Sequence, residues 1–361
     1  MTHSKATGVH GQTNIMAYAQ VFYGPDHPLK ACDVPLPSSL QAGEVLVEIA
    51  LTTICGSDLH TLSGHRPERT PCILGHEAVG HVVAVGSGRP DLRMGDRITW
   101  SIADSCGSCS ACSDYNLPEK CADLFKYGHA PLDDGSGLNG CYASHILLRQ
   151  GTHIVTLPDR LTDATVAPAN CALATVVNAA ETLPGRCDSV LIQGAGLLGL
   201  YCCALLAERG IKRIYCMDLH VERRRHSADF GAIPVEHVQD VLVREKEGVD
   251  AVFELAGASV LLKDGLEALR PGGFYILVGM VHPDTQIDLT GEQIIRKCVT
   301  MRGVHNYSPR HLDSAVAFLS RTASLNPYDE LVSPPIPLNE LDRAIELAQS
   351  QRFSRVSLIP S

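Results

Sequence analysis

The sequence predicts an α/β protein with a β-rich, barrel-like domain and a second domain built on a doubly wound parallel sheet. Two patterns in the sequence, one before and one after Asn170, support this prediction. Before Asn170, short alternating strands such as Glu44–Glu48 are separated by Gly and Pro, which is typical of a barrel-like domain. After Asn170, buried strands alternate with helices, and such crossovers build a parallel sheet. With 361 residues the chain is also longer than one ordinary hydrophobic core, so two domains are expected.

The composition indicates a soluble globular protein that binds neither nucleic acid nor membranes. Hydrophobic residues make up 45% of the chain and charged residues 19%, which is unlike a disordered protein. The 30 basic and 40 acidic residues give a formal charge of -10, whereas nucleic-acid binders are more often basic. No apolar run reaches the roughly 20 residues of a membrane-spanning helix. We interpret the polar residues 1–15 as a flexible extension and expect a cytoplasmic protein, in which clustered thiols bind metals.

Cys55 and His76 are the first residues that indicate chemistry. Cys55 opens the segment Cys-Gly-Ser-Asp-Leu-His and His76 stands in Gly-His-Glu, so a thiolate and an imidazole, both preferred zinc ligands, occur close together. A catalytic zinc site leaves one position open for water or substrate. The first segment also supplies the hydroxyl of Ser57, the carboxylate of Asp58 and the imidazole of His60. An ordinary loop carboxylate is the alternative interpretation of Asp58.

Four further cysteines form a second, independent cluster. Their spacing is Cys106-x2-Cys109-x2-Cys112-x8-Cys121. Four thiolates so close in sequence can converge on one tetrahedral ion, and a complete shell without water is typical of structural zinc. Polar and charged residues surround the cysteines, so burial as small apolar side chains is a poor alternative. The pattern predicts a zinc-stabilised lobe at about residues 104–123.

A glycine-rich loop indicates a dinucleotide site in the second domain. A buried strand from Ser189 to Gln193 leads into Gly-Ala-Gly-Leu-Leu-Gly, and a helix is expected from Leu200 to Arg209. In such a loop the glycines allow a tight turn and close approach of a pyrophosphate, whose charge meets the helix N-terminus. The loop residues expected to bind the cofactor are Gly194, Gly196, Leu197, Leu198 and Gly199.

Asp218 favours NAD as the cofactor. It ends the next strand, nineteen residues after Gly199, where a carboxylate binds the ribose 2′-hydroxyl of NAD and repels the 2′-phosphate of NADP. Arg223, further into the next helix, is a second expected contact, with a solvated helix face as the alternative.

Later segments complete the predicted parallel sheet. A helix is expected at residues 259–269, and strands are expected at residues 250–254, 273–279 and 300–304. Val278 and Val304 lie near the ends of the last two strands. Because ligands of such sheets bind outside the carboxyl ends of the strands, both are expected to contact the cofactor.

Together these motifs resemble the zinc-dependent medium-chain dehydrogenases, the zinc-type alcohol dehydrogenase family. The resemblance runs from about Met16 to the end of the chain and rests on residues 55–60, 75–77 and 95–97, the four-cysteine lobe and the Gly194 loop. It implies a homodimeric or homotetrameric enzyme. It also implies a GroES-like catalytic domain and a Rossmann NAD-binding domain, at residues 16–172 with 306–361 and at residues 173–305 respectively.

The same resemblance implies a role for each residue of the first metal site. The implied ligands of a catalytic zinc ion are Cys55, His76 and Cys171. Zinc acts as a Lewis acid on an alcohol, whose hydride passes to NAD. Ser57 takes the alcohol proton and His60 passes it towards solvent. Asp58 orients the histidine ligand, and Glu77 either supports the ligands or replaces one during exchange.

A narrower resemblance concerns the substrate. Residues 99–101, 124–129 and 304–307 are similar to a subgroup associated with phosphonate catabolism. This resemblance implies a hydroxyalkylphosphonate or its aldehyde as substrate and a cationic pocket, for which the available cations are Arg66, Lys126 and His129. Surface charges are the alternative interpretation of these three residues. A polyol, an amino alcohol or a general alcohol is the alternative substrate.

Two other functions are alternatives to the dehydrogenase. A zinc-free reductase of the same fold would lack the three zinc ligands. A non-catalytic scaffold that binds a dinucleotide would need only the four-cysteine lobe. One departure from the family pattern concerns that lobe, because its last cysteine follows eight residues where the family usually has seven, which leaves the loop conformation open.

Overall fold

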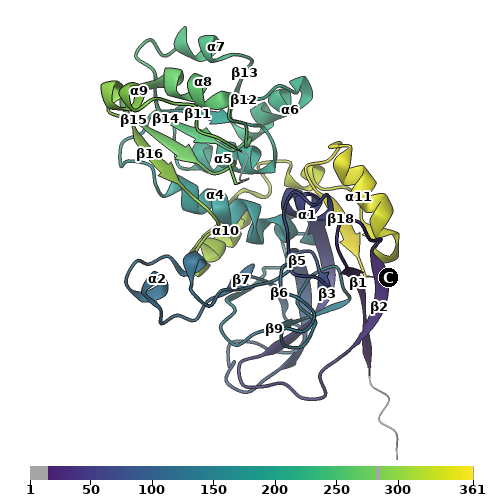
Figure 1. The fold of residues 1–361 in the computed structure, drawn as a ribbon. Coiled ribbons are helices and arrows are strands. Elements are labelled where there is room, and N and C mark those ends of the chain that lie inside the picture. The colour runs from purple at the N-terminus through teal and green to yellow at the C-terminus, as the bar shows by residue number, and fades with distance from the viewer. Residues whose placement is uncertain (1–14, 282–284, 361) are drawn as a thin grey trace, which may run out of the picture.

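The computed structural model describes residues 15–281 and 285–360, which fold into two domains (Figure 1). The lower domain in this view is rich in β-strands, and the upper domain contains a parallel sheet with helices, so the predicted α/β class is confirmed. Of the extension predicted at residues 1–15, only Ile15 lies within the described residues, and its carbonyl accepts a hydrogen bond from the N–H of Leu36 (2.9 Å). None of the helices in the described ranges has the length and apolar character needed to cross a membrane.

The β-rich domain is organised around its longest strand, β3 (Val45–Ile54). Three strands pair antiparallel with β3, namely β5 (Glu77–Val85), β9 (His145–Leu148) and β18 (Val356–Ile359). Since β18 lies near the C-terminus, the end of the chain returns to the domain formed by its beginning, and Figure 1 shows α11 and β18 beside β1. The other strands of this domain are β1 (Met16–Phe22), β2 (Lys30–Pro35), β4 (Cys72–Ile73), β6 (Arg97–Trp100), β7 (Ala103–Asp104), β8 (Phe125–Lys126), β10 (Ile154–Thr156) and β17 (Ile336–Pro337).

Short helices connect these strands. The first, α1 (Gly56–Leu62), follows β3 directly, and α2 (Ser110–Ser113) lies in a lobe that projects from the side of the barrel (Figure 1). The remaining helices of this part are α3 (Asp163–Val166) and α11 (Leu341–Gln349), with 3-10 turns η1 (Pro118–Lys120), η2 (Ala167–Asn170), η4 (Tyr328–Leu331) and η5 (Leu338–Glu340).

The second domain contains a six-stranded, wholly parallel sheet in the order β13-β12-β11-β14-β15-β16. The strand order reverses between β11 and β14, and the crevice at such a switch point is where doubly wound sheets bind ligands. Its strands are β11 (Ser189–Gln193), β12 (Arg213–Met217), β13 (Ile233–Val235), β14 (Val249–Glu254), β15 (Leu269–Leu277) and β16 (Thr300–Gly303). Its helices are α4 (Ala172–Ala180), α5 (Leu197–Glu208), α6 (Val221–His226), α7 (Val238–Leu242), α8 (Leu261–Ala268) and α9 (Gly291–Lys297), with the 3-10 turn η3 (Ser227–Phe230). Helix α10 (Pro309–Thr322) follows the last strand of the sheet and packs against α4.

Two boundaries in this domain differ from the prediction by three residues or more. The helix after the glycine loop begins at Leu197 rather than Leu200, because Gly196 is its N-cap and accepts the first helical hydrogen bond, from the N–H of Leu200 (3.0 Å). The fifth strand begins at Leu269, four residues before the predicted Gly273, since α8 already ends at Ala268.

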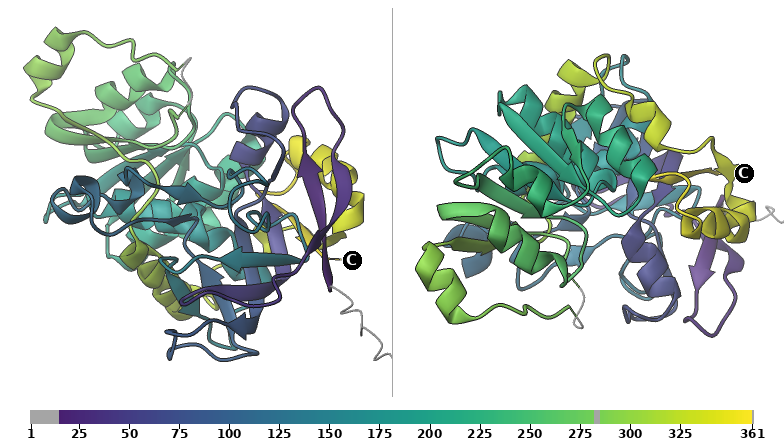
Figure 2. Two further views of the ribbon diagram at one scale, coloured as in Figure 1. Left: turned by 60° about the horizontal axis from the view of Figure 1, so that its bottom comes forward. Right: turned by 90° about the horizontal axis from the view of Figure 1, so that it is seen from above.

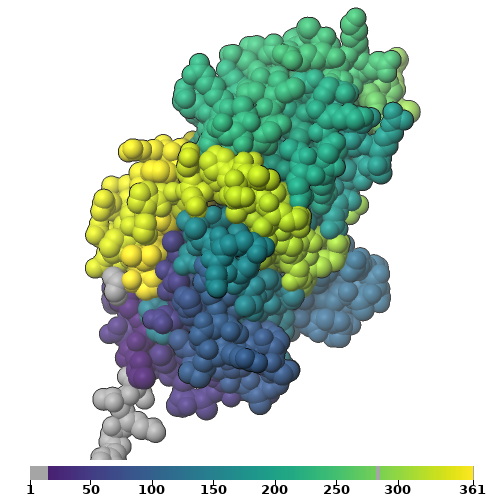
Figure 3. All heavy atoms as spheres, turned by 180° about the vertical axis from the view of Figure 1, so that it is seen from behind, coloured from purple at the N-terminus to yellow at the C-terminus, as the bar shows by residue number. Residues whose placement is uncertain are grey.

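The two domains share one continuous hydrophobic core. Leu51 and Val79 of the barrel strands belong to the same buried cluster as α4, α5 and strand β11 of the parallel sheet. Helix α4 packs against α5 and α10, and these helices lie between the two sheets in Figure 1. Both views of Figure 2 show the C-terminal part of the chain, coloured yellow, beside the purple strands from its beginning. From behind, Figure 3 shows residues near the C-terminus, coloured yellow, in contact with both domains. The junction is therefore a packed interface, and residues at the start of α4 lie where barrel and parallel sheet meet.

Candidate active site

The antiparallel pairing of β3 with β5 brings Cys55 close to His76. The register places Thr53 opposite Glu77, so the end of one strand meets the start of the other. Cys55 leaves β3 and is the N-cap of α1, where its N–H donates to Asp58 Oδ2 (2.9 Å). The two segments predicted to hold zinc thus lie side by side, and both ligand side chains are buried.

Cys171 joins this pair from the junction between η2 and α4. One ligand atom each from Cys55, His76, Glu77 and Cys171 lie within 4.8 Å of one another. The amide of Asn170 fixes the segment, because its Nδ2 donates to the carbonyl oxygens of His76 and Trp100 (both 3.0 Å). Two thiols and an imidazole at this separation fit the donor set and the size of a tetrahedral zinc site.

The electrostatics of the cluster also fit a cation. A hydrogen bond with Cys171, aided by the charges of Arg355 and His76, holds the pKa of Cys55 well below its usual value despite burial. Burial opposes protonation of His76, but the negative charge of Asp58 close by outweighs it and raises the pKa of His76 to about 10. The neighbouring thiol of Cys171 behaves in the opposite way, because Cys55 and burial raise the pKa of Cys171, and a zinc ion would displace the proton of this thiol on binding.

Asp58 lies behind the imidazole of His76 and is fully buried. Its Oδ1 is 3.4 Å from His76 Nδ1, and its Oδ2 accepts hydrogen bonds from Cys55 N–H and from the Tyr142 hydroxyl (3.0 Å). A carboxylate on the second nitrogen of a histidine ligand sets its tautomer and leaves Nε2 for the metal. Sequence reasoning missed Tyr142, which comes from a segment far from both motifs.

Glu77 forms a buried ion pair that sequence reasoning also missed. Its two carboxylate oxygens accept from Nε and Nη2 of Arg355 (2.7 and 2.9 Å), and Thr53 Oγ1 donates to the same carboxylate (2.6 Å). Arg355 Nη2 also lies 3.5 Å from Cys55 Sγ. Burial raises the pKa of Glu77 to about 7, and Arg355 limits the shift. The positive charge of Arg355 thus offsets the negative charges of the Glu77 carboxylate and the Cys55 thiolate beside the metal position.

The proposed proton path starts on α1. Ser57 is half-buried on its first turn, two residues after Cys55. His60 lies on the last turn, also half-buried, with its ring centroid 6.3 Å from that of His65 in an edge-on arrangement. One short helix therefore carries a zinc ligand position, a hydroxyl and an imidazole in sequence.

The four cysteines of the lobe converge as the spacing predicts. Their sulfur atoms lie within 4.8 Å of one another, and Cys109 Sγ is 3.5 Å from Cys112 Sγ and 3.9 Å from Cys121 Sγ. Backbone N–H groups of Cys106 and Asp123 donate to Cys121 Sγ (both 3.3 Å), which stabilises a thiolate. The last loop passes through Asn116, which has a positive φ of 54°. The complete set of four thiols fits structural zinc.

The glycine loop forms the crevice of the parallel sheet. Gly194 has a φ of +105°, and a Cβ on Gly199 would lie 1.9 Å from the carbonyl oxygen of Gly194, so both positions require glycine. Val278 and Val304 follow β15 and β16 and are buried, the N–H of Val304 donating to the carbonyl of Leu277 (2.9 Å). The residues predicted to bind the cofactor thus lie at the carboxyl ends of β11, β15 and β16.

Asp218 directly follows β12 and faces the glycine loop. Its Oδ2 accepts from the N–H of Ala195 (2.8 Å) and its Oδ1 from that of His220 (2.8 Å). Arg223 does not pair with this carboxylate, since its Nη2 donates to Gln351 Oε1 (3.0 Å) of the C-terminal segment. Arg224 is engaged as well, with the carbonyl of Asp218 and with Glu236.

The three candidate cations lie beside the zinc ligands. The ring centroid of His129 is 5.3 Å from that of His76. Arg66 and His129 both approach one carboxylate oxygen of Glu68, at 3.1 and 2.9 Å. Lys126, at the end of β8, is half-buried. His129 and Lys126 therefore lie near the candidate metal ligands, and Arg66 shares the carboxylate of Glu68 with His129.

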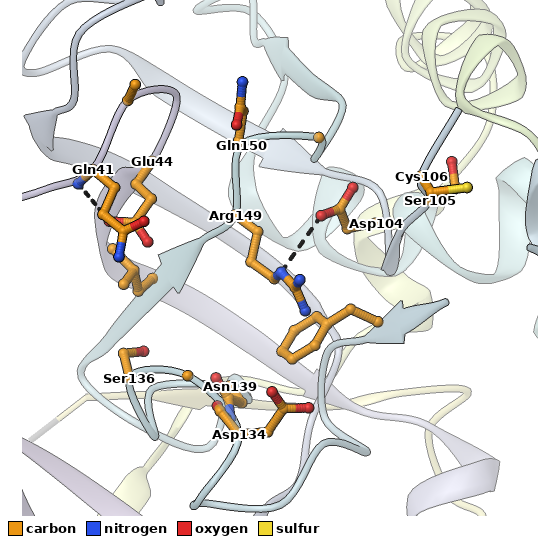
Figure 4. A pocket seen from close by; sticks show the side chains of 15 residues that line it. Gln41, Glu44, Asp104, Ser105, Cys106, Asp134, Ser136, Asn139, Arg149 and Gln150 are labelled. Atoms are coloured by element: carbon orange, nitrogen blue, oxygen red, sulfur yellow. Dashed lines mark hydrogen bonds and ion pairs between the residues drawn. The ribbon is translucent and has the colours of Figure 1, made fainter. Parts of the chain in front are cut away.

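The cavity in Figure 4 lies away from this chemistry. It has a volume of about 710 Å³ and includes Glu44, Asp104 and Arg149 in its lining. The guanidinium of Arg149 lies 4.4 Å from the ring centroid of Phe125 and its Nε is 3.6 Å from Asp104. Of the candidate metal ligands only Cys106 borders it, so the donor atoms, rather than this cavity, define the candidate active site.

Comparison with known proteins agrees with this geometry. The model of the alcohol dehydrogenase GroES-like domain matches residues 41–159, and that of the glucose dehydrogenase C-terminus matches residues 166–354. A sorbitol dehydrogenase of Halalkalibacterium halodurans is 29% identical over 88% of this chain and 92% of its own, and a D-arabitol-phosphate dehydrogenase of Enterococcus avium is 30% identical over 87% and 89%. The solved alcohol dehydrogenase of Thermotoga maritima superposes with a TM-score of 0.90, with 29% identity over 96% of this chain and 100% of its own. With its fold and both halves of its sequence matched, the chain belongs to the zinc-type medium-chain alcohol dehydrogenase family.

Proposed function

We propose that this enzyme oxidises an alcohol, or reduces the matching carbonyl compound, with one zinc ion bound by Cys55, His76 and Cys171 and with NAD as the hydride carrier. Membership of the family implies zinc and a nicotinamide cofactor; the ligands and the choice of NAD are our assignment. The observation that carries it is the convergence of these three side chains within 4.8 Å at the junction of the two domains. A second zinc ion on Cys106, Cys109, Cys112 and Cys121 would stabilise the lobe.

The chain's own residues would supply the proton path and the ligand geometry. The zinc ion, when bound, supplies Lewis-acid activation that lowers the pKa of the alcohol. Ser57 accepts the alcohol proton and His60 transfers it towards solvent. Asp58 holds the Nδ1–H tautomer of the histidine ligand. Arg355 keeps Glu77 paired and off the metal unless a ligand is exchanged.

The charges around the crevice support NAD over NADP. Asp218 sits where the adenosine ribose would bind, and a carboxylate there repels a 2′-phosphate. The three arginines that could attract such a phosphate are already engaged, Arg223 with Gln351, Arg224 with Glu236 and Arg225 with Glu222.

Three broader assignments complete the proposal. The catalytic domain comprises residues 16–172 and 306–361, and the NAD-binding domain comprises residues 173–305. We assign the enzyme to the cytoplasm, since all fourteen cysteines are free thiols, and to a homodimer or homotetramer by analogy with its family.

A hydroxyalkylphosphonate is the proposed substrate. Arg66, Lys126 and His129 beside the metal position support an anionic substrate. The relative named D-arabitol-phosphate dehydrogenase gives a precedent in its name for a phosphorylated substrate. A polyol is the second candidate, favoured by the relatives named sorbitol dehydrogenase and D-xylulose reductase.

Metal analysis and a substrate screen test the proposal. Purified protein should contain about two zinc ions per chain, and Cys171→Ser should lose one of them together with activity while NAD still binds. The screen compares a hydroxyalkylphosphonate, sorbitol and a simple alcohol, each with NAD and NADP. Failure of every alcohol to reduce either cofactor, with both zinc ions present, would contradict the proposed reaction.

A further inference from the structure

We propose that the substrate pocket selects alcohols that carry a doubly negative head group, a phosphonate or a phosphate monoester, and that Lys120 of the zinc lobe and His305 of the parallel-sheet domain complete the site that binds it. This inference rests on the proposed function and narrows its substrate class. It adds an outer pair of residues to the inner group formed by Arg66, Lys126 and His129.

The imidazole of His129 is the clearest sign of a binding site. It is 8% exposed, and neither of its ring nitrogens has a hydrogen-bond partner among the described residues. Its Nδ1 lies 2.9 Å from Glu68 Oε1, but the contact lacks the geometry of a hydrogen bond. A buried polar group without a partner is costly, so an imidazole left in this state next to His76 suits a ligand that brings its own hydrogen-bonding atoms.

Lys126 adds a cation that the protein itself leaves unpaired. It has no ion-pair partner within the residues that the structure describes, although Glu68 is near enough to influence it. Burial and repulsion by Arg66 lower the pKa of Lys126, while the thiols of the zinc ligands act in the opposite direction. Its ammonium group is therefore partly desolvated within the field of the metal site, and an incoming anion would offset that cost.

Lys120 and His305 form a second pair of residues close to Arg66 and Lys126. Lys120 Nζ lies 2.5 Å from His305 Nδ1, a contact between residues 185 positions apart in sequence. Lys120 directly precedes Cys121 of the lobe, and His305 follows β16 of the parallel sheet. Burial and repulsion by Lys120, Lys126 and Arg66 lower the pKa of His305 to about 4. His305 is thus close to the inner cations as well as to the lobe, and the contact links the zinc lobe to the pocket.

The charges of this group leave room for two negative charges. Three cations, Arg66, Lys120 and Lys126, face one carboxylate, that of Glu68, so the net charge is +2 with both imidazoles counted as neutral. The carboxylate of Asp58 also acts on His129, but the hydrogen bonds described above hold it behind the histidine ligand. A sulfonate or carboxylate would neutralise half of this charge, whereas a phosphonate or phosphate dianion would neutralise all of it.

A series of isosteric alcohols tests the charge requirement. The zinc-loaded enzyme is assayed with a hydroxyalkylphosphonate, the corresponding phosphate and sulfonate, and a neutral alcohol of equal chain length, at a pH above the second pKa of the phosphonate. We expect kcat/KM for the better of the two dianions to exceed that for the sulfonate by about 10-fold or more, because a hydrogen bond to a charged group changes affinity by about 10- to 100-fold. The phosphonate and phosphate arms identify which dianion is preferred.

Variants test the residues. Lys126→Met and Lys120→Met should each lower the ratio of kcat/KM for the preferred dianion to that for the neutral alcohol by about 10- to 100-fold. Lys120→Arg should restore the ratio, which separates charge from any effect on the neighbouring zinc ligand. Arg69→Met, which removes an exposed cation 4.0 Å from Asp133, is the matched control and should leave the ratio unchanged.

Two different failures remain distinguishable. Equal use of phosphonate, phosphate and sulfonate, or an unchanged ratio in Lys126→Met, overturns this inference while NAD-linked oxidation of the neutral alcohol still supports the proposed function. Absence of oxidation of every alcohol by enzyme with two zinc ions overturns both.

Discussion

Replacing Arg355 by methionine should lower the free energy of unfolding more than the replacement of an exposed arginine does. Arg355 is 8% exposed and Glu77 is 0% exposed, and two hydrogen bonds of 2.7 and 2.9 Å join them. Removing one partner of a buried ion pair costs about 3–5 kcal/mol, because it leaves an uncompensated charge. Burial already raises the pKa of Glu77 to about 7 with the arginine present, so in Arg355→Met the carboxyl would take up a proton near neutral pH, which limits the loss to the lower end of that range.

The measurement is urea unfolding of the zinc-loaded enzyme, followed by tryptophan fluorescence. Trp100 is the single tryptophan of the chain and is fully buried, and its carbonyl accepts the hydrogen bond from Asn170 beside the metal position. Glu77→Gln added to Arg355→Met should recover at least about 2 kcal/mol, the signature of coupled residues in a double-mutant cycle. Zinc content provides a second readout, since Arg355 Nη2 also lies 3.5 Å from Cys55 Sγ.

Arg343→Met is the control for the loss of an arginine. Its ion pair with Glu340 is exposed, so its removal should change the free energy of unfolding by no more than about 0.5 kcal/mol. Two results together would refute the idea that this ion pair constrains the site. Arg355→Met would lower the free energy of unfolding by less than about 1 kcal/mol, and the effects of Arg355→Met and Glu77→Gln would be additive in the double variant.

Four other substitutions probe the remaining parts of the structure. Gly199→Ala should lower the free energy of unfolding by about 1–3 kcal/mol, because its Cβ would lie 1.9 Å from the carbonyl oxygen of Gly194. Gly196→Ala has open space around its Cβ, so it should keep the stability of the protein and weaken NAD binding. Melting curves measure the first effect and cofactor titration the second. Asp250→Asn should lower the free energy of unfolding by about 1–3 kcal/mol near pH 7. Hydrogen bonds from Arg270 and from two backbone N–H groups outweigh the effect of burial and lower the pKa of the Asp250 carboxyl. The difference in stability from the unchanged enzyme should therefore disappear as the pH falls through that lowered pKa, below 3.8. Cys109→Ser should lose one of about two zinc ions and make the lobe sensitive to protease, and loss of both ions would show that the two centres depend on each other.

Much of the fold could be predicted because its signals are local. Strand β11 and the glycine loop have the residues that the sequence predicts, since a buried strand followed by glycines at these positions is typical of dinucleotide-binding folds. The predicted start of α5 is wrong because Gly196 acts as the helix cap from inside the loop, at a position where Ser, Thr, Asn and Asp are more common than glycine. The convergence of the two cysteine sets could be predicted as well, since thiols and imidazoles at short spacing are rare outside metal sites.

The partners that balance the site could not be predicted, because their residue types are common and their positions depend on the whole fold. A buried carboxylate such as Glu77 requires a cation, but 30 lysines and arginines are available in the chain. The antiparallel pairing of β18 with β3 makes the choice: Val356 lies opposite Ile54, so the preceding residue, Arg355, reaches the level of Cys55. A single register at the C-terminus therefore decides which charge lies beside the metal position, and a shift of one residue would turn that side chain to the other face of the sheet.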